Sequence, residues 1–309
     1  MNKKIFLLSD EVVHWNIVPT GNRKNVYMEL WGSHSTNRFL EVLQPFFNQT
    51  GLSVDWSIIG SNNIFEKPEE IDPTNDDFNH IFATWKQYEE GGSKAWRIQD
   101  IVHVGQNVQP SLNNQVSKDI EAADLVVFQD WGLNIRHFDI PELSASLKNK
   151  WVIYRSFTPI FEGTLWQEVQ NSSGSKKIII LRADDLRELN TSISKGLSWE
   201  QTIQDVINEI FIKRNVSLHP LRVNEYVIIS FGCTGTLLIH NNLDKPGDNP
   251  EIKIFFDSMG IEGYWEKAHP GYLPGDLELL AALLAKEILY PDKKIVSRTF
   301  KFNVCIIEY

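Results

Sequence analysis

Two short apolar runs decide the fold class of this chain: Leu125-Val126-Val127-Phe128 and Ile178-Ile179-Ile180-Leu181. A strand with one face in water alternates apolar and polar residues, and neither run shows this alternation. Continuous apolar strands are typical of parallel sheets that are covered on both faces. The two runs therefore predict the centre of an α/β fold.

Strand and helix patterns alternate on both sides of these runs. The predicted strands are Lys4–Ser9, Ser53–Ile59, Leu125–Gln129, Trp151–Arg155, Lys177–Leu181 and Tyr226–Ser230. Helices are predicted near Ser35–Asn48, Gln115–Ala122, Pro141–Lys148 and Gly163–Gln170, and from Ser198 and Gly275 onward. This alternation predicts a central, mostly parallel sheet with helices on both faces, in a single domain over residues 1–309.

The pattern is less regular before Leu125. Three segments there look like extra strands: Glu11–Val18, Val26–Trp31 and Trp96–Val102. We expect them to form a small β-lid, within about 11–31 and 96–102, that stands off the main sheet. Polar stretches at Ser61–Asn79 and Glu89–Ser93 are predicted as loops.

Composition and missing motifs exclude several function classes. The formal net charge of −10 disfavours nucleic acid or an anionic membrane as a partner, because both need clustered cations. The chain holds two cysteines, so no disulfide framework or Cys-based zinc site can be drawn, and no apolar run approaches the roughly 20 residues of a membrane helix. The glycine-rich phosphate-binding fingerprints, His-Glu-x-x-His and Gly-x-Ser-x-Gly are all absent. We expect a protein of the reducing cytoplasm that binds a small molecule, with a homo-oligomer or a partner domain left open.

The clearest functional signal comes from four segments in a fixed order. They are Trp31–Asn37 before a helix, Arg182–Arg187 after a strand, Ile229–Leu238 with its glycine pair, and Pro270–Asp276 opening a helix. In this order they resemble the motifs of the ribokinase-like, phosphofructokinase-B type carbohydrate kinases. The segments Ala183–Arg187 and Ile193–Glu200 are similar to a divergent bacterial branch of that family, some of whose members are joined to ryanodine-receptor-type repeat domains.

The resemblance implies an ATP-dependent small-molecule kinase that uses Mg²⁺ and phosphorylates a hydroxyl of a sugar or nucleoside-like compound. Asp276 is then the catalytic base and Gly275 part of the anion hole, at a helix start where the dipole favours phosphate. The implied nucleotide-binding residues are Gly232, Thr234, Gly235, Asp184 and Arg187. The implied substrate-binding residues are His14, Gly32, Ser33 and Asn37. A one-residue slip in the alignment with the family would offer Asp185 and Glu188 as metal ligands.

Three departures from the family pattern keep other functions open. Pro274 interrupts the anion-hole segment and has no N–H to donate, Arg187 stands where the family has a glutamate, and His14 replaces a substrate-binding aspartate. A kinase-derived sensor that binds a nucleotide or sugar without turnover is therefore the alternative function, and a structural scaffold is the third.

Independently of the family, Asp130 and Arg136 follow the carboxyl end of a predicted strand. Open parallel sheets bind ligands at this end of their strands, so both residues are secondary candidates for the site.

Overall fold

The computed structural model describes sixteen segments of the chain. They are residues 2–10, 12–19, 28–34, 43–48, 50–59, 79–90, 93–104, 115–133, 135–157, 160–186, 193, 199–230, 236–244, 249–257, 276–293 and 304–308. All structural statements below concern these residues.

A large mixed sheet forms the centre of the molecule. Its described strands are β4 (Val54–Ile59), β1 (Lys3–Ser9), β7 (Leu125–Gln129), β8 (Trp151–Arg155), β9 (Lys176–Arg182), β10 (Tyr226–Ser230), β11 (Thr236–His240), β12 (Glu251–Asp257) and β13 (Val304–Glu308), in that spatial order. Every pair from β4 to β10 is parallel, and β11, β12 and β13 extend the sheet as antiparallel strands. The predicted mostly parallel sheet is confirmed.

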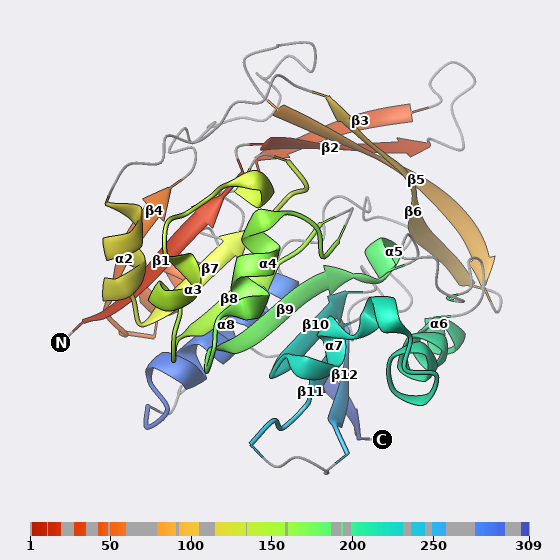
Figure 1. The fold of residues 1–309 in the computed structure, drawn as a ribbon. Coiled ribbons are helices and arrows are strands. Elements are labelled where there is room, and N and C mark those ends of the chain that lie inside the picture. The colour runs from red at the N-terminus through yellow and green to blue at the C-terminus, as the bar shows by residue number, and fades with distance from the viewer. Residues whose placement is uncertain are drawn as a thin grey trace.

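Helices cover both faces of this sheet. They are 43–48, α2 (Val116–Ala122), η2 (Ile135–His137), α3 (Leu143–Ser146), α4 (Thr164–Asn171), α5 (Ala183–Leu186), α6 (Trp199–Ile207), the π-helical η4 (Asn208–Ile212), η5 (Val216–Leu218), α7 (Pro220–Val223) and α8 (Asp276–Leu289). Figure 1 shows α2, α3 and α4 in front of the sheet and α8 behind it. None of the helices within the described segments is long and apolar enough to cross a membrane.

Alternate residues of each parallel strand enter two different cores. Phe6 and Leu8 of β1 pack into the core under α2 to α6, whereas Ile5 and Leu7 pack with α8 and the helix at 43–48. All four side chains are 0% exposed. Because successive residues of a strand point to opposite faces, a strand buried on both sides must be apolar throughout. This explains the unbroken apolar runs in the sequence.

A second, four-stranded sheet forms the predicted lid. Its strands are β3 (Met28–His34), β2 (Val12–Pro19), β5 (Asn79–Glu90) and β6 (Ser93–Val104), in that spatial order. β2 begins three residues after β1 ends, so the lid starts at the carboxyl end of a strand of the large sheet. In Figure 1 it lies beyond the end of the large sheet toward which β1 points.

One strand near the lid was not predicted, and two local predictions there were wrong. β5 was not predicted, because polar and apolar residues are mixed along it, as at His80, Phe82 and Thr84, and hide the alternation. Glu89 and Ser93, predicted in a loop, pair within the β5–β6 hairpin. The segment from Gly32 to His34, predicted as a turn before a helix, lies in β3.

Other boundaries moved only slightly. The helix predicted at Pro141–Lys148 shortens to α3, and the helix predicted at Gly163–Gln170 is α4, one residue further along the chain. Ser198 and the first half of the helix predicted at Ser35–Asn48 lie outside the described residues.

Candidate functional site

The candidate site lies at the carboxyl edge of the parallel strands. β1, β7, β8 and β9 all end there, and the last residue of each strand is polar or charged. Open parallel sheets bind ligands at this edge because the connecting loops diverge there. The lid sheet begins at the same edge, directly after β1.

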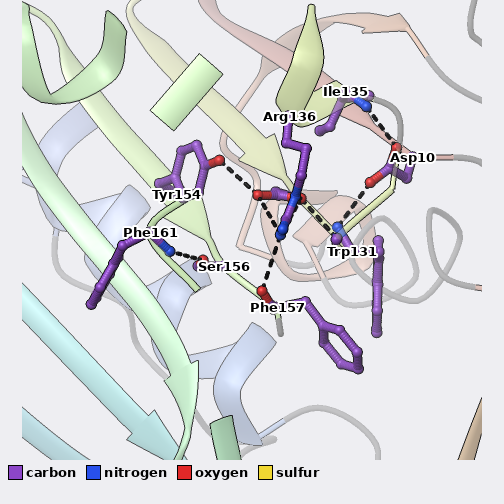
Figure 2. A network of polar contacts seen from close by, with 10 residues as sticks. Asp10, Trp131, Ile135, Arg136, Tyr154, Ser156, Phe157 and Phe161 are labelled. Carbon is purple, nitrogen blue, oxygen red and sulfur yellow. Dashed lines mark hydrogen bonds and ion pairs between the residues drawn. The ribbon is translucent and has the colours of Figure 1, made fainter. Parts of the chain in front are cut away.

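Asp10 fixes the loop that follows β7. Its two carboxylate oxygens accept hydrogen bonds from the backbone N–H groups of Trp131 and Ile135, each at 2.9 Å, as Figure 2 shows. Asp10 is 0% exposed, so these charge-assisted bonds form away from water. The end of β1 and the loop after β7 are therefore held as one unit.

Asp130 and Arg136 form a buried ion pair within this loop. Nε and Nη2 of Arg136 donate to Asp130, and Nη2 also donates to the carbonyl oxygen of Phe157 at 3.1 Å. Asp130 further accepts from the N–H of Gly132 and from the hydroxyl of Tyr154, both at 2.8 Å. Figure 2 shows the Arg136 side chain crossing toward Phe157. The structure thus brings together both secondary candidates, with each as the partner of the other.

Burial dominates the electrostatics of this network. It raises the pKa of the Asp130 carboxyl, while the Arg136 guanidinium, the Gly132 N–H and the Tyr154 hydroxyl act in the opposite direction. Burial and the adjacent Asp130 together raise the pKa of the Tyr154 phenol well above its usual value. The phenol therefore remains a hydrogen-bond donor across the physiological pH range.

Two more arginines stack on aromatic rings at the same edge. The Cζ atom of Arg155, the last residue of β8, lies 4.7 Å from the centre of the Trp131 ring. The Cζ atom of Arg182, the last residue of β9, lies 4.0 Å from the Phe157 ring, and the two rings are 5.0 Å apart. Trp131 and Phe157 are buried, whereas both arginines are partly exposed. Stacking on buried rings holds the guanidinium groups in a fixed place.

The direction of α8 follows from a contact at its far end. The Tyr290 hydroxyl, just beyond α8, donates to the carbonyl oxygen of Ser53, which precedes β4 at the amino edge of the sheet. A helix of this length spans about 20 Å, and its apolar face packs along the sheet through Ala281, Ala285 and Leu289. The first residue of α8, Asp276, is therefore directed toward the carboxyl edge.

The structure also brings together two of the predicted substrate-binding residues. His14 of β2 lies directly opposite Ser33 of β3, and Gly32 lies opposite Trp15. Trp15 is buried and its indole N–H donates to Nδ1 of His80 at 2.8 Å. The segment from Gly32 to Ser33 is thus anchored in the lid by regular strand pairing.

The remaining predicted residues are placed in part or not at all. Asp185 lies in α5, where its carboxylate holds the backbone N–H, Nε and Nη2 of Arg182. Asp184 lies in the same helix and Asp276 begins α8, both without a described side chain. The residues outside the described segments are Asn37, Arg187, Glu188, Gly232, Thr234, Gly235 and Gly275. Their predicted roles remain predictions.

Sequence reasoning missed four residues at this edge: Asp10, Tyr154, Arg155 and Arg182. Asp10, Arg155 and Arg182 end or directly follow predicted strands, which is the same signal that selected Asp130. Tyr154 carried no such signal, because it reads as one more apolar residue inside β8.

Comparisons with known proteins find similar solved structures of one class, all at low sequence identity. No family model and no curated protein matches this chain. Among solved structures, it is similar to a putative sugar kinase from Clostridium perfringens, at 10% identity over 100% of this chain and 99% of that one, with a TM-score of 0.38. It is also similar to Arabidopsis thaliana ribokinase complexed with ribose and ATP, at 13% identity over 81% and 77%, with a TM-score of 0.39. Phosphofructokinase-2 from Escherichia coli matches at 8% identity over 80% and 77%, with a TM-score of 0.36.

These neighbours are sugar kinases, which is the class that the four sequence segments resemble. Similarity at such identities and TM-scores carries no argument by itself. The α/β assignment therefore rests on the strand order and the two cores of this chain.

Proposed function

We propose that this protein is a divergent ATP-dependent small-molecule kinase of the cytoplasm, acting on a hydroxyl of a sugar or nucleoside-like compound. The observation that carries the proposal is the direction of α8. Its amino end, at Asp276, is aimed at the carboxyl edge where the lid begins and where Arg155 and Arg182 stand. A helix start favours anionic phosphate, and a carboxylate there is suited to accept a proton from an acceptor hydroxyl.

The reaction would proceed by in-line displacement. The acceptor oxygen forms a bond to the γ-phosphorus of ATP while the bond from that phosphorus to the bridging oxygen breaks. The electron pair of the broken bond leaves with ADP, and the hydroxyl proton passes to the Asp276 carboxylate. His14, Gly32, Ser33 and Asn37 would hold the acceptor on the lid side, and the 232–235 segment would hold the nucleotide.

ATP is expected to bind with Mg²⁺, but the described residues do not fit a metal site. No group of three potential ligands comes together among them, and the carboxylate of Asp185 is engaged by Arg182. We therefore assign no step of the reaction to a metal.

Asp276→Asn tests the proposal directly. Removing a general base typically lowers turnover by about 10²- to 10⁴-fold, with ATP affinity unchanged or improved because a negative charge near the phosphates is lost. Asp292→Asn is the matched control, because Asp292 is exposed and follows the opposite end of α8. ADP release is measured with a panel of sugars and nucleosides. Turnover that is equal in Asp276→Asn and wild type rules out this mechanism.

A sensor that binds a nucleotide or sugar without turnover is the second candidate function, and one observation favours it. Pro274 removes an N–H from the segment that would bind the developing charge. A sensor would show a thermal shift with ATP and no ADP release with any acceptor. If wild type shows no shift up to millimolar ATP, both the kinase and the nucleotide-sensor readings fail.

A further inference from the structure

Arg155 and Arg182 lie on the same face of the large sheet. Arg155 pairs with Ile180 on β9, and Ile180 and Arg182 are two residues apart on that strand, so both arginines project to the α8 side. From the strand spacing and the rise per residue, their Cα atoms are about 8 Å apart. This is the face along which α8 runs toward the same edge.

The geometry of Arg182 leaves part of its guanidinium available. Asp185, which is 1% exposed, holds Nε and Nη2 and so fixes the plane of the group. Nη1 of Arg182 makes no hydrogen bond or ion pair within the described residues, and the side chain is 15% exposed. A guanidinium that is oriented by one carboxylate can present its remaining N–H groups to a second anion.

Three carboxylates with described side chains at this edge are already engaged. Asp10 accepts two backbone N–H groups, Asp130 is paired with Arg136, and Asp185 with Arg182. The negative charge of these three side chains is therefore largely compensated within the protein. This contrasts with the chain as a whole, which carries a net charge of −10. An anion attracted to this protein must find such a local site rather than a general positive field.

We infer that Arg155 and Arg182 form a two-guanidinium clamp for the polyphosphate chain of a nucleotide. The identity of the ligand as a nucleotide rests on the proposed kinase function. The inference adds two residues to that function: Arg155, which lies outside the four family-like segments, and Arg182, which lies within one of them but has no role assigned by the resemblance. Pro274 removes a backbone N–H donor from the segment before α8. The guanidinium groups of the clamp would supply fixed N–H donors to the phosphates in its place. Arg155 lies on β8, between the lid side at β1 and β7 and the nucleotide side at β9 to β11.

Inorganic tripolyphosphate tests the clamp without a nucleoside or an acceptor. Its affinity for the full chain is measured by isothermal titration calorimetry in wild type, Arg155→Gln, Arg155→Lys and Arg182→Lys. Losing hydrogen bonds to a charged group lowers affinity by about 10- to 100-fold. We expect this loss in Arg155→Gln and a partial loss in both lysine variants, because lysine keeps the charge but not the planar fork. Lysine is used at position 182 so that the buried Asp185 keeps a cationic partner.

Arg222→Gln is the control. Arg222 is likewise partly buried, and it donates to the carbonyl oxygen of Ile210 on the α7 side, away from this edge. It should leave tripolyphosphate affinity within about 2-fold of wild type, well below the effect of a lost charge-assisted bond. Far-UV circular dichroism and the melting temperature confirm that each variant is folded.

The outcomes separate this inference from the proposed function. Tripolyphosphate binding that depends on Arg155 supports the clamp even if no acceptor is ever phosphorylated, in which case only the kinase proposal fails. Equal binding by wild type and Arg155→Gln, or no binding by wild type, overturns the clamp even if the protein proves to be an active kinase. Arg155-dependent binding of a sugar phosphate or sugar acid, with none of tripolyphosphate, also overturns it and assigns the arginines to an anionic acceptor.

Discussion

Replacing Arg136 with methionine probes the polar network at the carboxyl edge. Methionine keeps much of the side-chain volume but removes the bonds to Asp130 and to the Phe157 carbonyl. Arg136 is 2% exposed and Asp130 is 1% exposed, so the remaining carboxylate cannot recover its hydration. Breaking a buried pair by removing one partner typically costs about 3–5 kcal/mol. We expect a loss in this range despite the remaining bonds from Gly132 and Tyr154.

Urea unfolding, followed by tryptophan fluorescence and circular dichroism, measures this loss. Asp130→Leu with Arg136→Met completes a double-mutant cycle, in which the loss should be smaller than the sum of the single losses by at least about 1 kcal/mol. Lys148→Met is the control, because Lys148 is exposed and should change stability by less than about 0.5 kcal/mol. The cost of Arg136→Met should also shrink at low pH, because protonation of Asp130 removes the unpaired charge. A loss below about 1 kcal/mol at pH 7 would refute the structural role of the pair.

Three further changes test other parts of the structure. Asp10→Asn, which sets an amide NH₂ against one of the N–H groups of Trp131 and Ile135, should cost about 2–3 kcal/mol by urea unfolding. Burial raises the pKa of Asp124, but hydrogen bonds from a backbone N–H and a lysine at the start of β1 outweigh it, so the folded pKa lies below the usual 3.8. The contribution of the Asp124 carboxylate is present above the usual pKa and is lost as the pH falls through the folded pKa, so Asp124→Asn should cost about 0.5–1 kcal/mol at pH 7, and this cost should shrink as the pH falls in acid-unfolding curves. Ala285→Leu overfills the core beneath α8, where Ala285 is 0% exposed, and should lower stability by about 1–3 kcal/mol in the same unfolding assay.

The central sheet could be predicted from the sequence because its strands carry a strong local signal. Segments such as Leu125–Gln129 and Tyr226–Ser230 are apolar, short and bounded by polar loops, and the structure has strands at those bounds. The lid was harder, because β5 mixes aromatic and polar residues on both faces and gains its order from pairing with β2 and β6. Such pairing is not local and leaves little trace in a single segment.

The site shows the same division between local and non-local information. Asp130 and Arg136 could be selected because they follow a strand, but their mutual ion pair depends on how a 3₁₀ turn at η2 orients Arg136. The Arg155–Trp131 and Arg182–Phe157 contacts each join the end of one strand to the loop after the neighbouring strand, so no spacing in the sequence predicts them. The roles assigned to the 232–235 segment and to Gly275 rest on resemblance alone.

The strand order has a consequence for how this chain is made. β1 lies between β4 and β7, yet β7 begins at Leu125, 116 residues after β1 ends at Ser9. At a synthesis rate of about 5–20 residues per second, the ribosome needs roughly 6–23 seconds to produce that stretch. During this interval Ile5, Phe6, Leu7 and Leu8 have β4 as their only sheet partner among the described strands, with one edge unpaired. The later strands β7 to β12 each pair with the next one along the chain. We therefore expect the amino-terminal strand to be the part of the nascent chain most dependent on chaperones.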